Sequence, residues 1–423
     1  MRATRSLMIV MGLVAGSMAP VVVASPAGAG GVGLSGVSQV AANASMTCAV
    51  LQDTTARCWG MGPLGTGGAF NQTSTLAVQV QDANGDPLTG VTQVAVGTGF
   101  ACALLQDTSA VCWGENLVGN LGDGTTTPSA RPVVVQQQGG ATLTGITQLA
   151  LGDFHACARL SSGEARCWGQ NQGTIGDGTR TNRKRAVVVQ NGAGTGPLTN
   201  VTQLAAGSNH TCALLGDGTV RCFGENGQGQ IGDGTTTARL LPKLVKATSG
   251  TGSLTGVTQI SSRLQTTCAR LGGTGQLRCW GPNTNGQRGN GTVTLPGQAG
   301  PLRPTAVKAP SGTAAFTGAQ SVGVGAFHAC ARVTTAQLRC WGLNRDGQAG
   351  DGTRTSPRKL PVVVRNQFDT QPLSNAQTVV GADQHTCALL TDSTVQCWGA
   401  NNFGQVGDGT TTRRKLPTPV QAA

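Results

Sequence analysis

The spacing of its cysteines is the feature that most constrains how this chain folds. The 14 cysteines form seven pairs, of which six are ten residues apart and one is eleven apart. Within a pair, short β-prone runs flank turn residues such as Gly216-Asp217-Gly218, and glycine beside aspartate supplies the positive φ of tight hairpin turns. Folding the runs back on each other places the two cysteines opposite one another, within disulfide range. The sequence therefore predicts one disulfide within each of seven hairpins: Cys48 with Cys58, Cys102 with Cys112, Cys157 with Cys167, Cys212 with Cys222, Cys268 with Cys279, Cys330 with Cys340, and Cys387 with Cys397.

The hairpins recur with a long period. The first cysteine of each pair steps by 54 to 62 residues, a period typical of propellers and solenoids. One period contains four β-like segments, for example 201–207, 211–215, 219–224 and 241–245. Seven such units closing into a ring leave few free strand edges, whereas the coils of a β-solenoid, the alternative, are usually far shorter. We predict an all-β, seven-bladed β-propeller with four short antiparallel strands per blade, forming a single domain over residues 30–423.

The N-terminal segment has the features of a secretory signal peptide. Residues 1–29 contain two early arginines, an apolar run over 7–24, and small-residue cleavage sites after Ala24 or Ala29. A membrane anchor is the alternative, but glycines and a proline interrupt the run, and the rest of the chain offers no segment long enough to span a bilayer. Secretion also explains paired cysteines without metal binding or redox catalysis. We expect a secreted, extracellular monomer with no membrane span after cleavage.

A family resemblance is carried by the repeat itself. The pattern V-T-Q-L-A-A-G-S-N-H-T-C-A-L at 201–214, followed by G-T-V-R-C-F-G-E-N-G-Q-G-Q-I-G-D-G-T at 218–235, resembles the regulator of chromosome condensation repeat, whose members form seven-bladed β-propellers. The resemblance covers essentially the whole mature chain. The first copy, at 64–71, and the fifth, at Arg263 and 289–291, depart furthest from the pattern.

The resemblance implies binding rather than one particular activity. The nuclear founder of the family is a nucleotide-exchange factor for a small GTPase and binds chromatin. A signal peptide and a disulfide in every blade place this chain outside the cytosol, so we expect no small GTPase partner. Secreted bacterial β-lactamase-inhibitory proteins look like the same propeller and bind another protein across one face. The expected function is a non-enzymatic scaffold for an unknown protein partner, an inference by analogy of fold.

Side chains that recur around the ring are assigned to the scaffold. An aromatic residue follows the second cysteine of every pair, and neighbouring residues on a strand point to opposite faces, so we predict that these aromatics form the core between blades. Four histidines stand two residues before the first cysteine in four different blades, too far apart to share a metal. We predict structural hydrogen bonds for them. The aromatics are Trp59, Trp113, Trp168, Phe223, Trp280, Trp341 and Trp398, and the histidines are His155, His210, His328 and His385.

The acidic residues offer little for catalysis or metal binding. Each Asp-Gly-Thr loop holds a single carboxylate, whereas calcium needs several clustered oxygen ligands, so we predict that each aspartate closes its own turn. A propeller glycosidase is the enzyme alternative, but the chain has no tyrosine, and nine of its 18 acidic residues belong to the repeat. We therefore predict no catalytic residues, no metal and no cofactor. The five aspartates are Asp123, Asp177, Asp233, Asp351 and Asp408.

Two variable features are candidate binding surfaces. The residues just before the histidine position vary between copies and should emerge on one end of the ring, where loops carry function; random drift of a surface is the alternative. The candidates are Phe100, Asp153, Phe154, Asn209, Leu264, Gln265, Phe327, Asp383 and Gln384.

Basic residues also cluster after the Asp-Gly-Thr loops, at Arg183, Lys184, Arg185, Arg358, Lys359, Arg413, Arg414 and Lys415. The formal charge of +12 suits an anionic partner such as a cell-wall polymer, although charges beside an outer strand also discourage edge-to-edge aggregation.

Overall fold

The computed structural model describes residues 32–295 and 300–423. The signal peptide predicted for 1–29 lies outside the described residues. Within them, no helix is both long and apolar enough to cross a bilayer.

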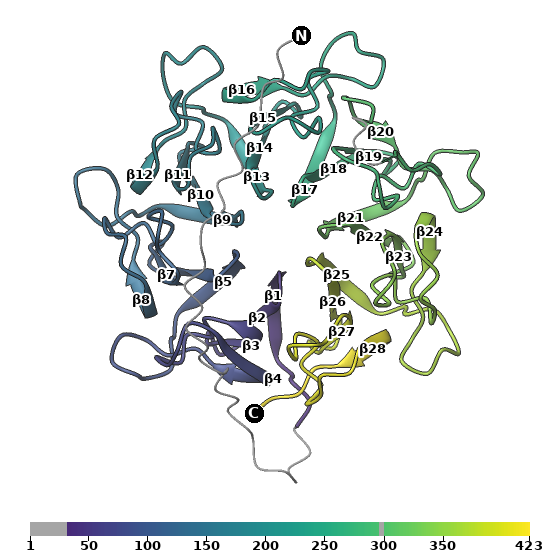
Figure 1. Ribbon diagram of the computed structural model, residues 1–423, viewed down its shortest axis with the longest axis horizontal. Coiled ribbons are helices and arrows are strands. Elements are labelled where there is room, and N and C mark those ends of the chain that lie inside the picture. Colours follow the sequence, from purple (N-terminus) through teal and green to yellow (C-terminus); the bar gives the residue numbers. More distant parts are fainter. Residues whose placement is uncertain (1–31, 296–299) are drawn as a thin grey trace, which may run out of the picture.

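Seven four-stranded antiparallel sheets surround a central channel, which confirms the predicted propeller (Figure 1). In every sheet the four strands follow one another in the sequence. Blades are numbered 1 to 7 along the chain, and each has an inner, a second, a third and an outer strand.

The strand bounds repeat from blade to blade. The inner strands are β1 (Val37–Asn43), β5 (Val91–Val96), β9 (Ile146–Leu151), β13 (Val201–Ala206), β17 (Val257–Arg263), β21 (Ala319–Val324) and β25 (Ala376–Gly381). The second strands are β2 (Met46–Leu51), β6 (Phe100–Leu105), β10 (His155–Leu160), β14 (His210–Leu215), β18 (Thr266–Leu271), β22 (His328–Val333) and β26 (His385–Leu390). The third strands are β3 (Ala56–Gly62), β7 (Ala110–Gly114), β11 (Ala165–Gly169), β15 (Val220–Gly224), β19 (Leu277–Trp280), β23 (Leu338–Gly342) and β27 (Val395–Gly399). The outer strands are β4 (Gln72–Gln79), β8 (Ser129–Val134), β12 (Arg183–Val188), β16 (Arg239–Leu244), β20 (Thr305–Ala306), β24 (Arg358–Val363) and β28 (Arg414–Pro419).

The central hairpin of each blade has the predicted register. In blade 4, Cys212 pairs with Cys222 and Leu214 with Val220. The turn closes through a hydrogen bond from the Leu215 N–H to the Thr219 carbonyl.

All seven predicted disulfides are present, with Cα–Cα distances of 4.0 to 4.1 Å. Every blade is therefore cross-linked within its own two central strands, and the described chain has no free cysteine. From blade 1 to blade 7 the bonds join Cys48 to Cys58, Cys102 to Cys112, Cys157 to Cys167, Cys212 to Cys222, Cys268 to Cys279, Cys330 to Cys340, and Cys387 to Cys397.

The outer strands begin earlier than the sequence predicted. In blade 4 the outer strand starts at Arg239 rather than Leu241, because a register shift beyond Cys222 lets Arg239 pair with Gly224. The same shift occurs in blades 3, 6 and 7. A bulge of this kind inserts extra residues on one strand without ending the ladder, so Arg239 and its counterparts Arg183, Arg358 and Arg414 belong to the outer strands.

The predicted aromatic core between blades is confirmed. All six tryptophan side chains and Phe223 are fully buried, and each indole N–H donates to a backbone carbonyl of the preceding blade, such as Trp168 to Asn120 at 3.0 Å. A glycine is required beside each of these aromatic side chains. A Cβ on Gly122 would lie 2.8 Å from the indole nitrogen of Trp168, and its φ is +73°, a conformation that glycine adopts without strain.

One buried core position in blade 5 departs from the repeat. The third-to-outer loop buries an apolar side chain in the other blades, at Leu64, Leu121, Ile175, Ile231, Ala349 and Val406. In blade 5 this position is Arg288, which is fully buried. Its guanidinium donates to the carbonyl oxygens of Gly281 (2.7 Å) and Pro301 (2.8 Å), and burial lowers its pKa to about 10. Among the described residues no carboxylate forms a salt bridge with it.

The ring closes where the two ends of the described chain meet, as predicted. Blades 1 and 7 lie side by side (Figure 1). The Leu34 N–H donates to the Val420 carbonyl at 2.8 Å, and the Ala77 N–H donates to the Gln421 carbonyl at 3.0 Å. No strand is exchanged between the first and last sheets. The closure is therefore made by tail contacts and by the core between the two blades.

Candidate functional site

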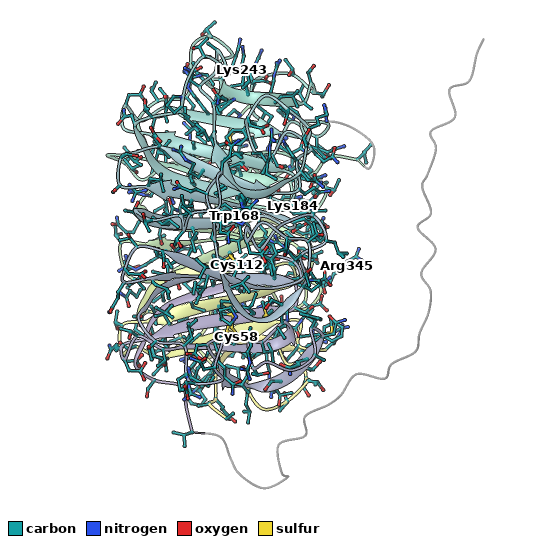
Figure 2. The ribbon with its side chains drawn as sticks, turned by 90° about the vertical axis from the view of Figure 1, so that its left-hand side faces the viewer. Cys58, Cys112, Trp168, Lys184, Lys243 and Arg345 are labelled. Carbon is teal, nitrogen blue, oxygen red and sulfur yellow. A yellow bond between two sulfur atoms is a disulfide. The ribbon has the colours of Figure 1, made fainter. Side chains whose placement is uncertain are left out.

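Two sets of loops from each blade meet on one face of the ring. The inner loops join the inner strand to the second strand, and the outer loops join the third strand to the outer strand. The N–H of Glu225, in an outer loop, donates to the carbonyl of Asn209, in an inner loop, at 2.8 Å. Equivalent bonds recur in other blades. Together these loops form one surface, which we call the loop face. Figure 2 shows the ring edge-on, with the outer-loop residue Arg345 at its right-hand side.

At the centre of the loop face an arginine joins three blades. Arg263, at the end of β17 in blade 5, is only 4% exposed. Its Nη1 lies 2.8 Å from Oδ1 of Asp153 in blade 3, and its Nη2 lies 2.6 Å from Oδ1 of Asp383 in blade 7. Asp153 also accepts hydrogen bonds from Thr98 in blade 2 (3.0 Å) and Ser208 in blade 4 (2.5 Å). Five blades are thus connected across this end of the channel.

The arginine network keeps its aspartate ionised. Burial opposes ionisation of Asp153, but the charge of Arg263 and the hydrogen bonds from Ser208 and Thr98 outweigh it, so the pKa of Asp153 lies below its usual value. The sequence predicted Asp153 and Asp383 in the site but not the residue that joins them.

A signal for Arg263 was present in the repeat. Four blades have glycine at this position, where a side chain would be crowded: a Cβ on Gly207 would lie 2.2 Å from the imidazole of His210 in the same blade and 2.5 Å from the Leu264 carbonyl oxygen of the next blade. Blade 5 has Thr266 in place of the histidine, so position 263 has room for a long side chain. The glycines at the equivalent position are Gly97, Gly152, Gly207 and Gly325.

The seven inner strands line a channel cavity of about 430 Å³. At the open edge of an inner strand, unpaired backbone N–H and carbonyl groups form hydrogen bonds with the side-chain amide of a glutamine from the preceding blade. The side-chain amide of Gln93 donates to the Leu149 carbonyl at 2.9 Å, and its oxygen accepts from the Leu149 N–H at 2.8 Å. The same two-way contact is made by Gln39, Gln148, Gln203 and Gln259. These backbone groups are therefore not available to a ligand in the channel.

The residues predicted for the loop face differ from one another in solvent exposure. Phe154 is 38% exposed, and Gln384 is also exposed. Asp153, Asn209, Leu264, Gln265, Phe327 and Asp383 are half-buried. The prediction for Phe100 is wrong: its side chain is fully buried and packs with Ala156 of the next blade. Phe100 occupies the inward-pointing position that is histidine in four other blades, so it belongs to the core.

Two exposed apolar residues of the loop face were missed. Leu117 is 75% exposed and Phe403 is 39% exposed, both on outer loops. The signal lay in comparing outer loops between copies, because the residues equivalent to Leu117 are Gly227, Thr284, Arg345 and Asn402. The scaffold therefore does not require an apolar side chain there.

Half of the residues in the basic cluster are paired with aspartates, which the sequence did not predict. Arg183, Arg358 and Arg414 each form a salt bridge with the Asp-Gly-Thr aspartate of the same blade, and Arg413 bridges to Asp346 at 3.0 Å. Arg185 donates to Gln136. Lys184, Lys359 and Lys415 are exposed, and among the described residues they form no salt bridge.

Each Asp-Gly-Thr aspartate closes its own loop, as predicted. In blade 4, Oδ1 of Asp233 accepts from the backbone and hydroxyl of Thr235 at 3.0 and 2.7 Å, while Oδ2 accepts from Arg239. Burial opposes ionisation of Asp233, but hydrogen bonds from Thr235 and Arg239 lower its pKa overall. The carboxylate is thus fully engaged within its blade.

The histidines form hydrogen bonds between blades, as predicted. His155 Nε2 lies 2.8 Å from the hydroxyl of Thr211 in the next blade. That hydroxyl donates to the Thr174 carbonyl, so the imidazole is the donor to it. The other pairs are His210 with Thr267, His328 with Thr386, and His385 with Thr47. Burial lowers the histidine pKa values to about 4 for His155 and His328 and about 3 for His210 and His385. In the part of the chain that the structure describes, no three metal-ligating side chains gather.

The repeat matches a known family. The family model of the regulator of chromosome condensation (RCC1) repeat matches residues 146–173, 201–230, 319–348 and 376–405, which carry the inner strand, hairpin and outer-loop start of blades 3, 4, 6 and 7. The chain is an RCC1-like propeller.

Relatives of this RCC1-like propeller differ widely in size. The ultraviolet-B receptor UVR8 of Arabidopsis thaliana is 27% identical over 391 residues, covering 90% of this chain and 81% of that protein. The E3 ubiquitin-protein ligase HERC2 of Homo sapiens is 30% identical over 280 residues, covering 64% of this chain but only 5% of that protein. Because so little of HERC2 is matched, its ligase activity is not carried over.

Solved structures share the fold. Prp20p from Saccharomyces cerevisiae, described with its binding to Gsp1p and histones, has a TM-score of 0.69 at 20% identity and covers 92% of this chain and 88% of its own. Human WBSCR16 has a TM-score of 0.67 at 18% identity, with 86% and 89% covered. At such identities the likeness shows the propeller architecture alone.

Proposed function

We propose that this RCC1-like propeller is a secreted, non-enzymatic scaffold that binds a protein partner through its loop face. One observation carries the proposal: Leu117, Phe154 and Phe403 expose apolar side chains on this face. At the position of Leu117 the other long outer loops have polar residues or glycine and still fold. Exposed apolar groups that packing does not require are typical of interaction sites.

The centre of the loop face supports this function. Arg263 ties the inner loops of Asp153 and Asp383 together, so the loops need little ordering when a partner arrives. Preorganised surfaces lose less conformational entropy on binding.

The polar groups of the same region favour binding over catalysis. Asp153 and Asp383 are held by Arg263, and the four histidines are buried with lowered pKa values. Neither set offers an exposed general acid or base. The absence of a small GTPase partner stays a prediction, based on the expected signal peptide and the seven disulfides. A nucleotide-exchange assay with a purified small GTPase tests it: release of bound nucleotide would contradict it.

An anionic envelope polymer is the second candidate. It is favoured by the exposed side chains of Lys184, Lys359 and Lys415, but salt bridges to aspartates already neutralise Arg183, Arg358 and Arg414. A polymer held by the remaining lysines would be released by salt.

A pull-down from culture supernatant and envelope fractions separates the two candidates. The bait is the wild type, a loop-face variant (Phe154→Ala with Phe403→Ala), or a lysine variant (Lys184→Glu, Lys359→Glu and Lys415→Glu). We expect a protein that resists high-salt washing and is lost only from the loop-face variant. A polymer that salt removes and that only the lysine variant loses would contradict the proposal.

A further inference from the structure

Two loops from neighbouring blades adjoin at the seam between blades 2 and 3. The outer loop of blade 2 reaches over blade 3, where the indole of Trp168 donates to the Asn120 carbonyl at 3.0 Å. A Cβ on Gly169 would lie 2.5 Å from the Phe154 carbonyl oxygen and 3.3 Å from the Asn120 Cα. The outer loop of blade 2 and the inner loop of blade 3 therefore meet directly above Gly169.

Both loops carry apolar side chains that the scaffold does not need. Leu117 and Phe154 are exposed, and Val118 beside Leu117 is half-buried. The residues equivalent to Phe154 are polar or glycine in five of the six other blades, at Ser45, Gly99, Asn209, Gln265 and Gln384. Two independent departures from the repeat thus fall on adjoining loops. We call Leu117, Val118 and Phe154 the seam patch.

The outer border of the seam patch is positively charged. The outer strand β12 runs beside the loop, because a Cβ on Gly119 would lie 2.6 Å from the Lys184 Cα. Lys184 and Arg180 are exposed, and neither forms a salt bridge within the described residues. Arg183 between them is neutralised by Asp177 at 2.6 Å.

On its inner side the loop carries Glu115, which is half-buried. Burial raises the pKa of this carboxyl group. Glu115 lies beside Gly99 of the inner loop, whereas Lys184, four residues after the exposed Arg180, lies beside Gly119 at the outer border.

We propose that the seam patch is the anchoring site for a protein segment that presents an apolar side chain flanked by carboxylates. The apolar side chain would cover Leu117 and Phe154, and the carboxylates would face Lys184 and Arg180. The inference rests on the proposed function and specifies where on the loop face the partner binds and what chemistry it carries. A second copy of this chain fits poorly, because a symmetric contact would bring the same cationic border against itself.

Phage-displayed random peptides of about twelve residues, selected on the immobilised full chain, provide the probe. We expect enriched peptides to combine an aromatic or leucine residue with aspartate or glutamate. Leu117→Asp and Phe154→Ser should each weaken their binding about tenfold or more. Lys184→Glu should weaken it more at about 50 mM than at about 500 mM salt.

Matched controls separate failure of the patch from failure of the face. Phe403→Ser changes an equally exposed phenylalanine of the loop face in the outer loop of blade 7. Phe368→Ser changes an exposed phenylalanine in the connection between β24 and β25, which leaves from the opposite end of the sheets. Peptides lost with Phe403→Ser but not with Leu117→Asp or Phe154→Ser would overturn the seam patch and leave the loop face in place. Peptides lost only with Phe368→Ser would overturn both.

Three further results would overturn the inference. These are enrichment of basic peptides, selection that does not distinguish the wild type from the variant combining Leu117→Asp with Phe154→Ser, and a concentration-dependent dimer that Leu117→Asp dissolves. The substituted side chains are exposed, so each variant should keep the wild-type melting temperature. Leu117→Ser serves as a milder substitute if Leu117→Asp does not.

Discussion

Acidification from pH 7 to pH 5 should lower the free energy of unfolding by about 7 to 8 kcal/mol, because four histidines are buried neutral between blades. Their pKa values in the folded chain are about 4 or about 3, against about 6.5 when unfolded. Stability from a lowered histidine pKa is fully present above pH 6.5 and is lost as the pH falls toward 4 for His155 and His328 and toward 3 for His210 and His385, since only the unfolded chain binds protons in that window. Each unit of pH costs about 1.4 kcal/mol per histidine, or about 2 kcal/mol each by pH 5.

The ring contains a natural control for this effect. Where the histidine is replaced, the facing threonine of the next blade is replaced too. The three such seams carry Met46 with Ala101, Phe100 with Ala156, and Thr266 with Ala329. Copying one of them with His155→Phe and Thr211→Ala gives the seam between blades 3 and 4 the pair that blades 2 and 3 already have.

Urea unfolding with the disulfides intact, at pH 7 and pH 5, measures the difference. The double variant should lose about 2 kcal/mol less than the wild type on acidification, whatever its stability at pH 7. Thr211→Ser keeps the hydroxyl and the histidine and should lose as much as the wild type. The reasoning is refuted if the wild type is equally stable at both pH values, or if the double variant loses as much as the wild type.

Three other changes test the architecture. Arg263→Leu leaves Asp153 buried without its cation and should lower the free energy of unfolding, measured with urea, by about 3 kcal/mol or more. Adding Asp153→Asn should recover part of this loss. An unchanged free energy of unfolding in Arg263→Leu would show that the network does not stabilise the fold. Deleting Lys415–Ala423 removes most of β28 and the closing tail, so the melting temperature should fall substantially, and an unchanged value would argue against closure at this seam. Arg288→Leu restores the apolar core residue of blade 2 and should leave stability unchanged or raise it by about 1 to 4 kcal/mol; a loss above about 2 kcal/mol would mean that the buried arginine is needed.

The hairpins and their disulfides could be predicted because their signals are local. The two cysteines of a blade are separated only by their own strands and turn, and the repeat presents the same signal seven times. The outer strands were placed too late because their first paired residue, such as Arg239, is separated from the rest of the ladder by a bulge that leaves no mark in the sequence.

The centre of the loop face could not be predicted in the same way. Arg263 meets Asp153 and Asp383 across 110 and 120 residues, so their contact depends on the closed ring. Phe100 was misplaced because apolar character alone does not tell an exposed loop residue from the first core residue of the following strand. Leu117 was missed because it lies in an outer loop, whereas the apolar candidates were predicted from the variable residues of the inner loops alone.

Closure without strand exchange makes the order of the blades independent of where the chain begins. Every sheet is built from one uninterrupted stretch of sequence, so a cut between any two blades severs no ladder of paired strands. The Ala422 N–H donates to the Val32 carbonyl at 2.8 Å, so the two ends of the described chain are close enough for a short peptide to join them. A circularly permuted chain that starts in the connection at 190–198 would thus contain the same seven cross-linked sheets.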